Sequence, residues 1–226
     1  MWGIVESMDI KTDDITLTTP TGPAAAYLAA PRDGGPGVLV LHAWWGLNDD
    51  FKKWCDDLAR AGFTALAPDY RDGRVVDTID EADAMRKDFS PQQTGAVVHA
   101  AKDDLLARAG GPNIGIIGAS MGAGWAFDLA ESEPEQIRAV VAYYGIAEAD
   151  WSKVKARVLH HFGDIDQMDP LEDAEAMQQE MEKGGVDATL EVYPGADHWF
   201  AEPGRPEYDA EAAALAWQRT LDFLKN

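Results

Sequence analysis

One stretch near the middle of the chain constrains the fold more than any other. The apolar run at 114–117 leads into Gly118-Ala119-Ser120-Met121-Gly122, and a helical pattern follows from Trp125. This is the G-x-S-x-G pattern at a strand–turn–helix junction, the context in which it exposes a serine hydroxyl as a nucleophile. The two glycines would let strand and helix approach closely around a serine with a strained backbone. An ordinary glycine-rich turn between a strand and a helix is the alternative.

The segments around this turn alternate between strand-like and helix-like patterns. Two extended runs flank Pro20-Thr21-Gly22-Pro23 and predict an antiparallel hairpin of residues 14–19 and 24–30. The alternation beyond the hairpin predicts a mainly parallel central sheet with helices on both faces. The expected strands are 38–41, 63–67, 114–117, 137–143, 156–161 and 188–193, and the expected helices are 49–61, 79–87, 90–109, the segment after Ser120 to about 131, 171–183 and 208–225. No repeat or linker divides the chain, so residues 1–226 are expected to form one α/β domain.

The charge balance narrows the possible partners. The 40 acidic residues outnumber the 19 basic ones and give a formal net charge of −21. A phosphate-binding surface needs a concentration of lysine and arginine, so nucleic acid and anionic membranes are not expected partners. The acidic residues are scattered, which indicates a solvated surface, and a small molecule is the expected partner. No feature of the sequence indicates an oligomeric state.

The sequence also bears on location. Residues 1–14 have neither a basic start nor an apolar core, so no secretory signal is expected there. No segment approaches the ~18 apolar residues of a membrane span. Cys55 is the single cysteine, which excludes an internal disulfide. A cytoplasmic location is the simplest expectation, although a mature exported protein that had lost its signal would look the same.

A serine hydroxyl is a weak nucleophile and needs a base within hydrogen-bond reach, itself oriented by an acid. His198 is the candidate base, because it follows the last predicted strand in a Pro/Gly turn from which it could reach the strand ends. The other histidines lie in or next to predicted strands or in a helix: His42, His99, His160 and His161. A solvated loop position is the alternative for His198.

The candidate acid lies in the loop after the predicted strand 156–161. Asp164, Asp166 and Asp169 compete there. Asp166 is preferred because it lies deep in the loop, before the helix start at Pro170, and Asp164 is second. Asp169 is expected to cap that helix. Serine, acid and histidine then follow one another along the chain, each on a loop after a strand.

A metal site formed by His160, His161, Asp164 and Asp166 is a competing interpretation. Adjacent residues on a strand point to opposite faces, so the two histidines cannot easily bind one ion. The chain also has no H-E-x-x-H motif and no cysteine–histidine pairing. Neither a metal nor a cofactor is therefore expected.

Acyl transfer also requires two backbone N–H groups that stabilise the developing oxyanion. Met121 directly follows the nucleophile, and Trp44 lies in the loop after the first central strand, so these two are the candidate donors. Trp44, Trp45 and Trp199 are expected to form an apolar pocket wall. Trp125, on the helix after the serine, is expected in the core.

Together these residues resemble the dienelactone hydrolase family of α/β-hydrolases, and the likeness covers nearly the whole chain. The segments that carry it are Leu41-His42-Ala43-Trp44-Trp45-Gly46-Leu47-Asn48, Ala67-Pro68-Asp69-Tyr70, Gly118-Ala119-Ser120-Met121-Gly122-Ala123-Gly124, Ala142-Tyr143-Tyr144-Gly145, Gly163-Asp164-Ile165-Asp166 with Pro170, and Gly195-Ala196-Asp197-His198-Trp199-Phe200. The resemblance implies the α/β-hydrolase fold and hydrolytic chemistry. It also places Asp166, rather than Asp164, at the family's acid position.

The sequence departs from the best-known members of the family at the site. Those members carry a glutamate-assisted cysteine nucleophile, whereas this chain has Ser120, and Ala43 stands at the glutamate position. They also use an arginine shortly after the histidine to bind a substrate carboxylate. The fourth residue after the histidine here is Glu202, which is expected to repel an anionic lactone. Arg71 is a candidate for a second anion-binding arginine in the pocket, and Arg205 is a weaker one.

Three functions are consistent with these residues. The first is a serine hydrolase that cleaves small neutral carboxylic esters or lactones through an acyl-enzyme on Ser120. The second is a true dienelactone hydrolase, a carboxymethylenebutenolidase, in which Arg71 binds the substrate carboxylate. The third is a binding protein of the same fold that holds a ligand without turnover, although a binding role does not require an intact triad.

Overall fold

A central sheet organises the computed structural model, which describes residues 9–226. Residues 1–8, part of the segment in which no export signal is expected, lie outside the described residues. The strands are β1 (Ile10–Thr19), β2 (Gly22–Pro31), β3 (Gly37–Leu41), β4 (Thr64–Pro68), β5 (Ile114–Ala119), β6 (Ile137–Tyr143), β7 (Arg157–Gly163) and β8 (Ala188–Tyr193). They form one eight-stranded sheet in the order β1-β2-β4-β3-β5-β6-β7-β8 within the described residues. β1 and β2 form the expected antiparallel hairpin, β2 is also antiparallel to β4, and all other neighbours are parallel.

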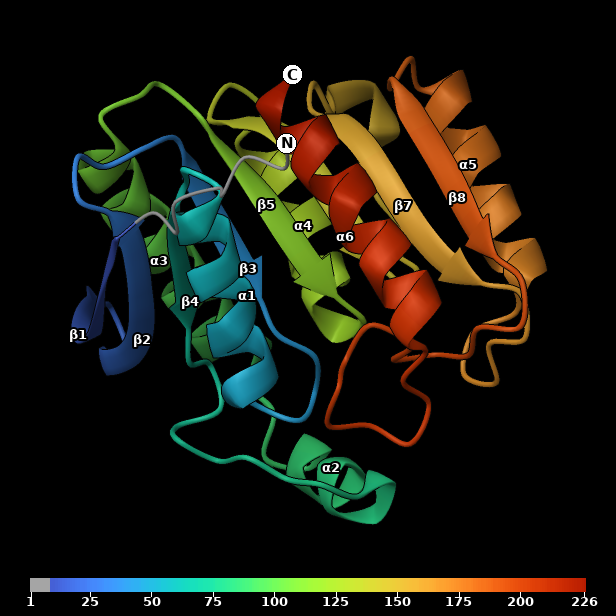
Figure 1. Cartoon of the computed structure of the whole chain (residues 1–226), viewed down its shortest axis with the longest axis horizontal. Helices are drawn as coiled ribbons and strands as arrows, with labels where there is room; N and C mark the ends of the chain where they lie inside the picture. Colours follow the sequence, from blue (N-terminus) through green and yellow to red (C-terminus); the bar gives the residue numbers. More distant parts are fainter. Residues whose placement is uncertain (1–8) are drawn as a thin grey trace, which may run out of the picture.

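Helices cover both faces of this sheet, as predicted (Figure 1). The helices are α1 (Asp49–Arg60), α2 (Ile79–Arg86), α3 (Pro91–Ala109), α4 (Met121–Ser132), α5 (Leu171–Lys183) and α6 (Ala210–Lys225). Helices α1 and α6 contribute to one buried apolar cluster, and α3, α4 and α5 contribute to a second. The sheet therefore separates two apolar cores, and its central strands β3 and β5 are buried at every position.

Local sequence signals explain where several helices begin. The side chain of Asn48 accepts a hydrogen bond from the Phe51 N–H and caps α1. Ser90 caps α3, with Pro91 in its first turn. Thr78 and Glu81 form a capping box at the start of α2. Helix α2 lies at one end of the molecule, apart from the helices that cover the sheet (Figure 1).

Some predicted boundaries were wrong. Helix α6 begins at Ala210 rather than 208, because Asp209 accepts hydrogen bonds from the Glu211 and Ala212 N–H groups and so stands outside the helix. Asp169 does not cap α5: the capping position is Pro170, which has no side-chain cap. A short 3-10 helix at Trp151–Lys153 was not predicted.

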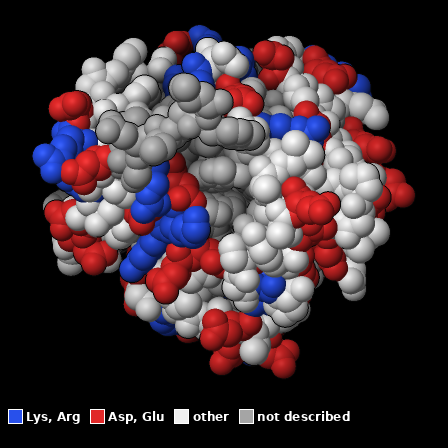
Figure 2. All heavy atoms as spheres, viewed as in Figure 1, with Lys and Arg blue, Asp and Glu red and all other residues white. Residues whose placement is uncertain are grey.

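Most of the charged side chains lie on the surface, where acidic and basic groups are mixed. On the face seen in Figure 2, acidic and basic residues are interspersed. Most ion pairs of the described residues involve side chains with substantial exposure, such as Arg60 with Asp57 on α1. Pairs of this kind contribute little to stability, so the apolar cores are the main source of it. Within residues 9–226, no helix has the length and apolar character needed to cross a bilayer.

Candidate active site

Ser120 lies at the sharp turn between β5 and α4. Its φ of 51° is in the left-handed region, which is unusual for a residue with a side chain. A Cβ added to Gly118 would lie 2.4 Å from the Gly122 carbonyl oxygen, and one added to Gly122 would lie 2.2 Å from the Leu41 carbonyl oxygen. Glycine is therefore required at both positions, as predicted. The first turn of α4 follows directly, so the positive end of its dipole lies beside the serine.

Three predicted side chains meet beside this turn. The Ser120 Oγ lies 2.9 Å from His198 Nε2, and His198 Nδ1 lies 2.7 Å from Asp166 Oδ2. The side chains of His198 and Asp166 are almost fully buried. The arrangement has the geometry of a nucleophile, a base and an orienting acid.

The loop after β7 fixes the position of the acid. Asp166 Oδ1 accepts hydrogen bonds from the Met168 and Asp169 N–H groups, which leaves Oδ2 for the histidine. Asp164, the second candidate, is exposed and instead accepts a hydrogen bond from the Gly195 N–H. Of the three competing aspartates, only Asp166 contacts His198 through a hydrogen bond.

The end of β6 and the two residues that follow it pack against Ser120. The Ser120 N–H donates to the Tyr143 carbonyl over 2.8 Å. A Cβ at Gly145 would lie 2.6 Å from the Ser120 carbonyl oxygen, so this segment packs closely against the serine. Between them, Tyr144 has a φ of 39°, and its ring centroid lies 5.1 Å from that of His198. Residues 143–145 thus contact both the nucleophile and the base.

A cavity of about 470 Å³ opens over Ser120 and His198. Its lining residues are Trp44, Arg71, Arg86, Phe89, Ser120, Met121, Met168, Asp169, His198 and Trp199. Trp44 and Trp199 lie in the wall, as expected, with their rings stacked at 6.0 Å. Trp45 is fully buried and is not among the lining residues. It packs edge-on against both of these rings and so supports the wall from behind.

The two expected oxyanion donors border the same cavity. Met121 and Trp44 are both lining residues. Within the described residues, neither backbone N–H donates a hydrogen bond to a backbone acceptor outside the regular helices and strands. The Met121 N–H is one of the unpaired donors at the start of α4. Both groups are therefore available to a developing negative charge in the cavity.

Arg71 supplies a buried positive charge to the cavity. The residue is 2% exposed, and its Nε has no hydrogen-bond partner among the described residues. The guanidinium lies over the Phe89 ring at 5.1 Å and forms no ion pair with a described carboxylate. Burial lowers its pKa from the usual range, but an arginine stays charged in proteins. A buried unpaired cation of this kind favours a negatively charged group of a ligand.

Four lining residues were not anticipated from the sequence. Arg86 and Phe89 come from α2 and the segment after it, and Met168 and Asp169 come from the loop of the acid. Asp169 is half-buried, and burial raises the pKa of its carboxyl. No local pattern indicates that Arg86 and Phe89 line the cavity, because this placement depends on tertiary contacts.

Glu202 does not lie where the sequence suggested. It is fully buried and is not among the lining residues of the cavity. Its Oε1 accepts a hydrogen bond from the Tyr144 hydroxyl over 2.9 Å. Burial raises the pKa of this carboxyl to about 8. The structure contradicts the expectation that Glu202 faces an anionic substrate, because the side chain lies outside the cavity.

Arg205, the weaker anion-binding candidate, is also absent from the cavity lining. Its guanidinium stacks on the Trp45 ring at 3.8 Å and donates to the Asp77 carbonyl. Arg205 therefore connects the loop after His198 to the segment that leads into α2.

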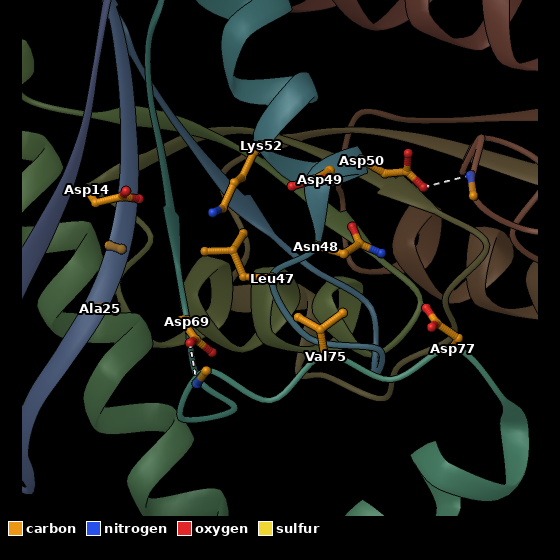
Figure 3. A pocket seen from close by; sticks show the side chains of 13 residues that line it. Asp14, Ala25, Leu47, Asn48, Asp49, Asp50, Lys52, Asp69, Val75 and Asp77 are labelled. Carbon is orange, nitrogen blue, oxygen red and sulfur yellow. Dashed lines mark hydrogen bonds between the residues drawn. The ribbon is translucent and has the colours of Figure 1, made fainter.

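Another cavity, of about 540 Å³, lies elsewhere (Figure 3). Its wall contains Asp14, Asp49, Asp50, Asp69 and Asp77, with one lysine and no serine, cysteine or histidine. It therefore offers no nucleophile or base. Within residues 9–226, no group of three or more His, Cys, Asp or Glu side chains is placed to hold a metal ion, and the cluster considered around His160 and His161 is not such a group.

Comparisons with known proteins agree with this architecture. The fold and the strand–serine–helix turn are those of the α/β-hydrolases. The model of the dienelactone hydrolase family matches residues 24–226, and the chain belongs to that family. It is 32% identical over 211 residues to "Protein usf" of Aquifex pyrophilus. This alignment covers 88% of this chain and 91% of the relative. A protein of Aquifex aeolicus named "Putative carboxymethylenebutenolidase" is 29% identical over 211 residues, with the same coverage.

A solved structure extends the comparison to three dimensions. A Klebsiella pneumoniae protein described as "Putative Dienelactone Hydrolase" superposes with a TM-score of 0.87 at 25% identity. The match covers 96% of this chain and 99% of that one. The protein is accordingly a hydrolase of this family.

Proposed function

We propose that the protein is a serine hydrolase that cleaves small carboxylic esters or lactones through an acyl-enzyme. Ser120 attacks the substrate carbonyl, and His198 accepts the serine proton and returns it to the leaving group. Asp166 orients the imidazole and stabilises its charged form. Water activated by His198 then releases the acyl group from Ser120. No cofactor takes part.

The observation that carries this proposal is the continuous hydrogen-bonded chain from the serine to the acid. Its two contacts, at 2.9 Å and 2.7 Å, are within the reach that proton transfer requires. The free N–H groups of Met121 and Trp44 support it, because a tetrahedral oxyanion needs donors on the side of the nucleophile. Burial of the His198 and Asp166 side chains also strengthens their interaction by excluding water.

The test compares Ser120→Ala with the wild type on p-nitrophenyl acetate. We expect the variant to lose at least about a thousandfold in kcat, since the nucleophile is removed. A fluorophosphonate probe should label the wild type at Ser120 and leave the variant unlabelled. Full hydrolysis by purified Ser120→Ala would refute the proposal. Absence of labelling in a folded wild type would favour the binding-protein alternative.

A second candidate is a true dienelactone hydrolase, whose substrate carries a carboxylate. The buried, unpaired guanidinium of Arg71 in the wall of the cavity favours it. Glu202 does not face the substrate carboxylate, because it lies outside the cavity, and burial raises its pKa to about 8. The name of the Aquifex aeolicus relative is consistent with this substrate class.

The two candidates differ in their charge preference. A carboxylate-bearing lactone or ester should have a higher kcat/KM than a neutral ester of the same size if Arg71 binds the carboxylate. Equal values for the two would support the neutral-ester function. Both measurements use the same wild-type enzyme, so they require no variant.

A further inference from the structure

The loop of the base and the loop that supports the nucleophile are joined by one buried hydrogen bond. Tyr144 lies in the segment that follows β6, and Glu202 closes the turn that begins at Trp199, directly after His198. The Tyr144 hydroxyl donates to Glu202 Oε1 over 2.9 Å, and both residues are 0% exposed. This contact connects the two loops beneath the catalytic pair.

Tyr144 and Glu202 each lie in a segment that adjoins Ser120 or His198. On the Tyr144 side, the preceding Tyr143 carbonyl accepts the Ser120 N–H, and the Tyr144 ring lies beside the His198 ring. On the Glu202 side, the Glu202 N–H donates to the Trp199 carbonyl, and Trp199 has a φ of 62°. A non-glycine residue holds such a conformation only when its surroundings enforce it. Tyr144 has the same left-handed sign of φ, so strain is present on both sides of the contact.

The surroundings of Glu202 favour its neutral form. Its Oε2 has no hydrogen-bond partner among the described residues, and a buried unpartnered charge is far more costly than a buried neutral carboxyl. Burial is the main cause that raises its pKa to about 8, and Asp50 and Glu207 raise it further. The Tyr144 hydrogen bond and Arg205 act in the opposite direction. These four groups are the titratable or charged groups that influence the carboxyl.

Two of these neighbours are held in place by other contacts. Asp50, in the first turn of α1, accepts the Gly204 N–H over 2.9 Å, as Figure 3 shows. Arg205 stacks on Trp45 and donates from Nη1 to the Asp77 carbonyl. Burial and the neighbouring Glu202 hold the pKa of Tyr144 well above its usual range, so this hydroxyl remains a donor. Arg205 is the cation that favours an ionised Glu202, but its guanidinium also pairs with Glu207 at 3.6 Å.

We propose that neutral Glu202 is a positioning residue. By accepting the Tyr144 hydrogen bond, it holds the loop that carries His198 at a fixed position relative to residues 143–145, which contact Ser120. Ionisation introduces a buried charge that faces Asp50 and drives the turn 199–202 out of this arrangement. The Ser120–His198 contact is then lost, and turnover falls on the alkaline side. This inference rests on the proposed serine hydrolase function.

The test is the dependence of kcat on pH between 6 and 10, measured by pH-stat on ethyl butyrate. For the wild type, we expect a fall above about pH 8, approaching tenfold per pH unit. Glu202→Gln retains the acceptor for Tyr144 and cannot ionise, so it should keep its rate at pH 7 within about threefold and lose this alkaline fall. The matched control Glu211→Gln changes an exposed acid on α6 and should keep the wild-type profile.

Tyr144→Phe removes the donor and provides a second variant. We expect kcat at pH 7 to fall roughly tenfold with KM within about twofold, because the change acts on the alignment of the catalytic pair. An alkaline fall in Glu202→Gln identical to that of the wild type would overturn the proposal. An unchanged kcat in Tyr144→Phe would do the same.

A readout without turnover separates this inference from the proposed function. The NMR signal of the His198 ring, assigned by its loss in His198→Asn, should shift near pH 8 in the wild type and not in Glu202→Gln. If no ester is cleaved but this shift is present, the proposed function fails and the positioning role stands. If esters are cleaved and the shift is the same in both proteins, the positioning role fails.

Discussion

The Nη2 of Arg71 lies 3.3 Å from the Sδ of Met121, the residue that directly follows Ser120. This contact places a buried positive charge next to the turn that presents the nucleophile. The backbone of Arg71 is held by Asp69, which accepts the Arg71 and Gly73 N–H groups. A substrate carboxylate bound by Arg71 would therefore be anchored at a fixed position relative to the serine.

Substitution of Arg71 should weaken the binding of anionic esters more than that of neutral esters. We expect Arg71→Gln to raise KM for monoethyl succinate by about 10- to 100-fold, since a charge-assisted contact is lost. KM for ethyl butyrate should change by less than about threefold. Arg74→Gln is the matched control, because Arg74 lies on the same turn with an exposed side chain paired with Asp88. Equal effects of Arg71→Gln on both esters would show that Arg71 does not bind the carboxylate.

The proposed role of Asp166 can be tested against that of Asp164, which lies in the same loop after β7. Asp166→Asn should lower kcat by roughly 10³- to 10⁴-fold, because the imidazole loses its orienting carboxylate. Asp164→Asn, which alters only the contact with the Gly195 N–H, should lower kcat by less than about fivefold. Steady-state kinetics on p-nitrophenyl acetate measure both. Comparable losses in the two variants would argue against Asp166 as the specific partner of His198.

The glycines at the start of α4 should differ sharply in their tolerance of alanine. Gly122→Ala places a Cβ 2.2 Å from the Leu41 carbonyl oxygen, a backbone atom in a central strand. We expect a loss of at least about 3 kcal/mol in the free energy of unfolding. Gly124→Ala meets no atom within 4 Å and should be neutral or stabilising by up to about 1 kcal/mol. Urea denaturation measures both, and similar stabilities would contradict the close approach of strand and helix.

The stability of the fold should depend on pH through Glu202. Its pKa is about 8 in the folded protein, against the ordinary glutamate value of 4.5 in the unfolded chain, so the native state binds more protons between these values. The contribution of this group to stability is therefore fully present below pH 4.5 and is lost as pH rises through about 8. Relative to the wild type, Glu202→Gln should gain about 3–4 kcal/mol in unfolding free energy between pH 5 and pH 8. Thermal or urea denaturation at the two pH values provides the test, and a difference that does not grow with pH would contradict it.

Much of the framework could be predicted because its signals are local. The apolar runs and the caps at Asn48 and Ser90 act within a few residues, and the corresponding elements agree with the prediction to within a few positions. The glycines around Ser120 have a steric requirement that the sequence displays directly. Ser120, Asp166 and His198 come directly after the parallel strands β5, β7 and β8. Their meeting could be predicted because the carboxyl ends of parallel strands share one edge of the sheet.

The remaining features depend on tertiary contacts that no short pattern encodes. Glu202 and Tyr144 are 58 positions apart, and the burial that changes the charge state of Glu202 is visible only in the folded protein. Trp45 and Trp44 are adjacent in the sequence, yet only Trp44 borders the cavity. Arg86 and Phe89 reach the cavity from a segment whose own sequence predicts only a helix at 79–87.

The contribution of Arg86 and Phe89 has a consequence for the evolution of this enzyme. The reacting groups are fixed at the edge of the central sheet, whereas these two wall residues come from a peripheral connection between β4 and α3. Insertions or exchanges within that connection can alter which molecules are admitted while the reaction itself is conserved. This part of the cavity wall can therefore diversify independently of the reacting groups, whereas Met168 and Trp199 are encoded beside the acid and the base.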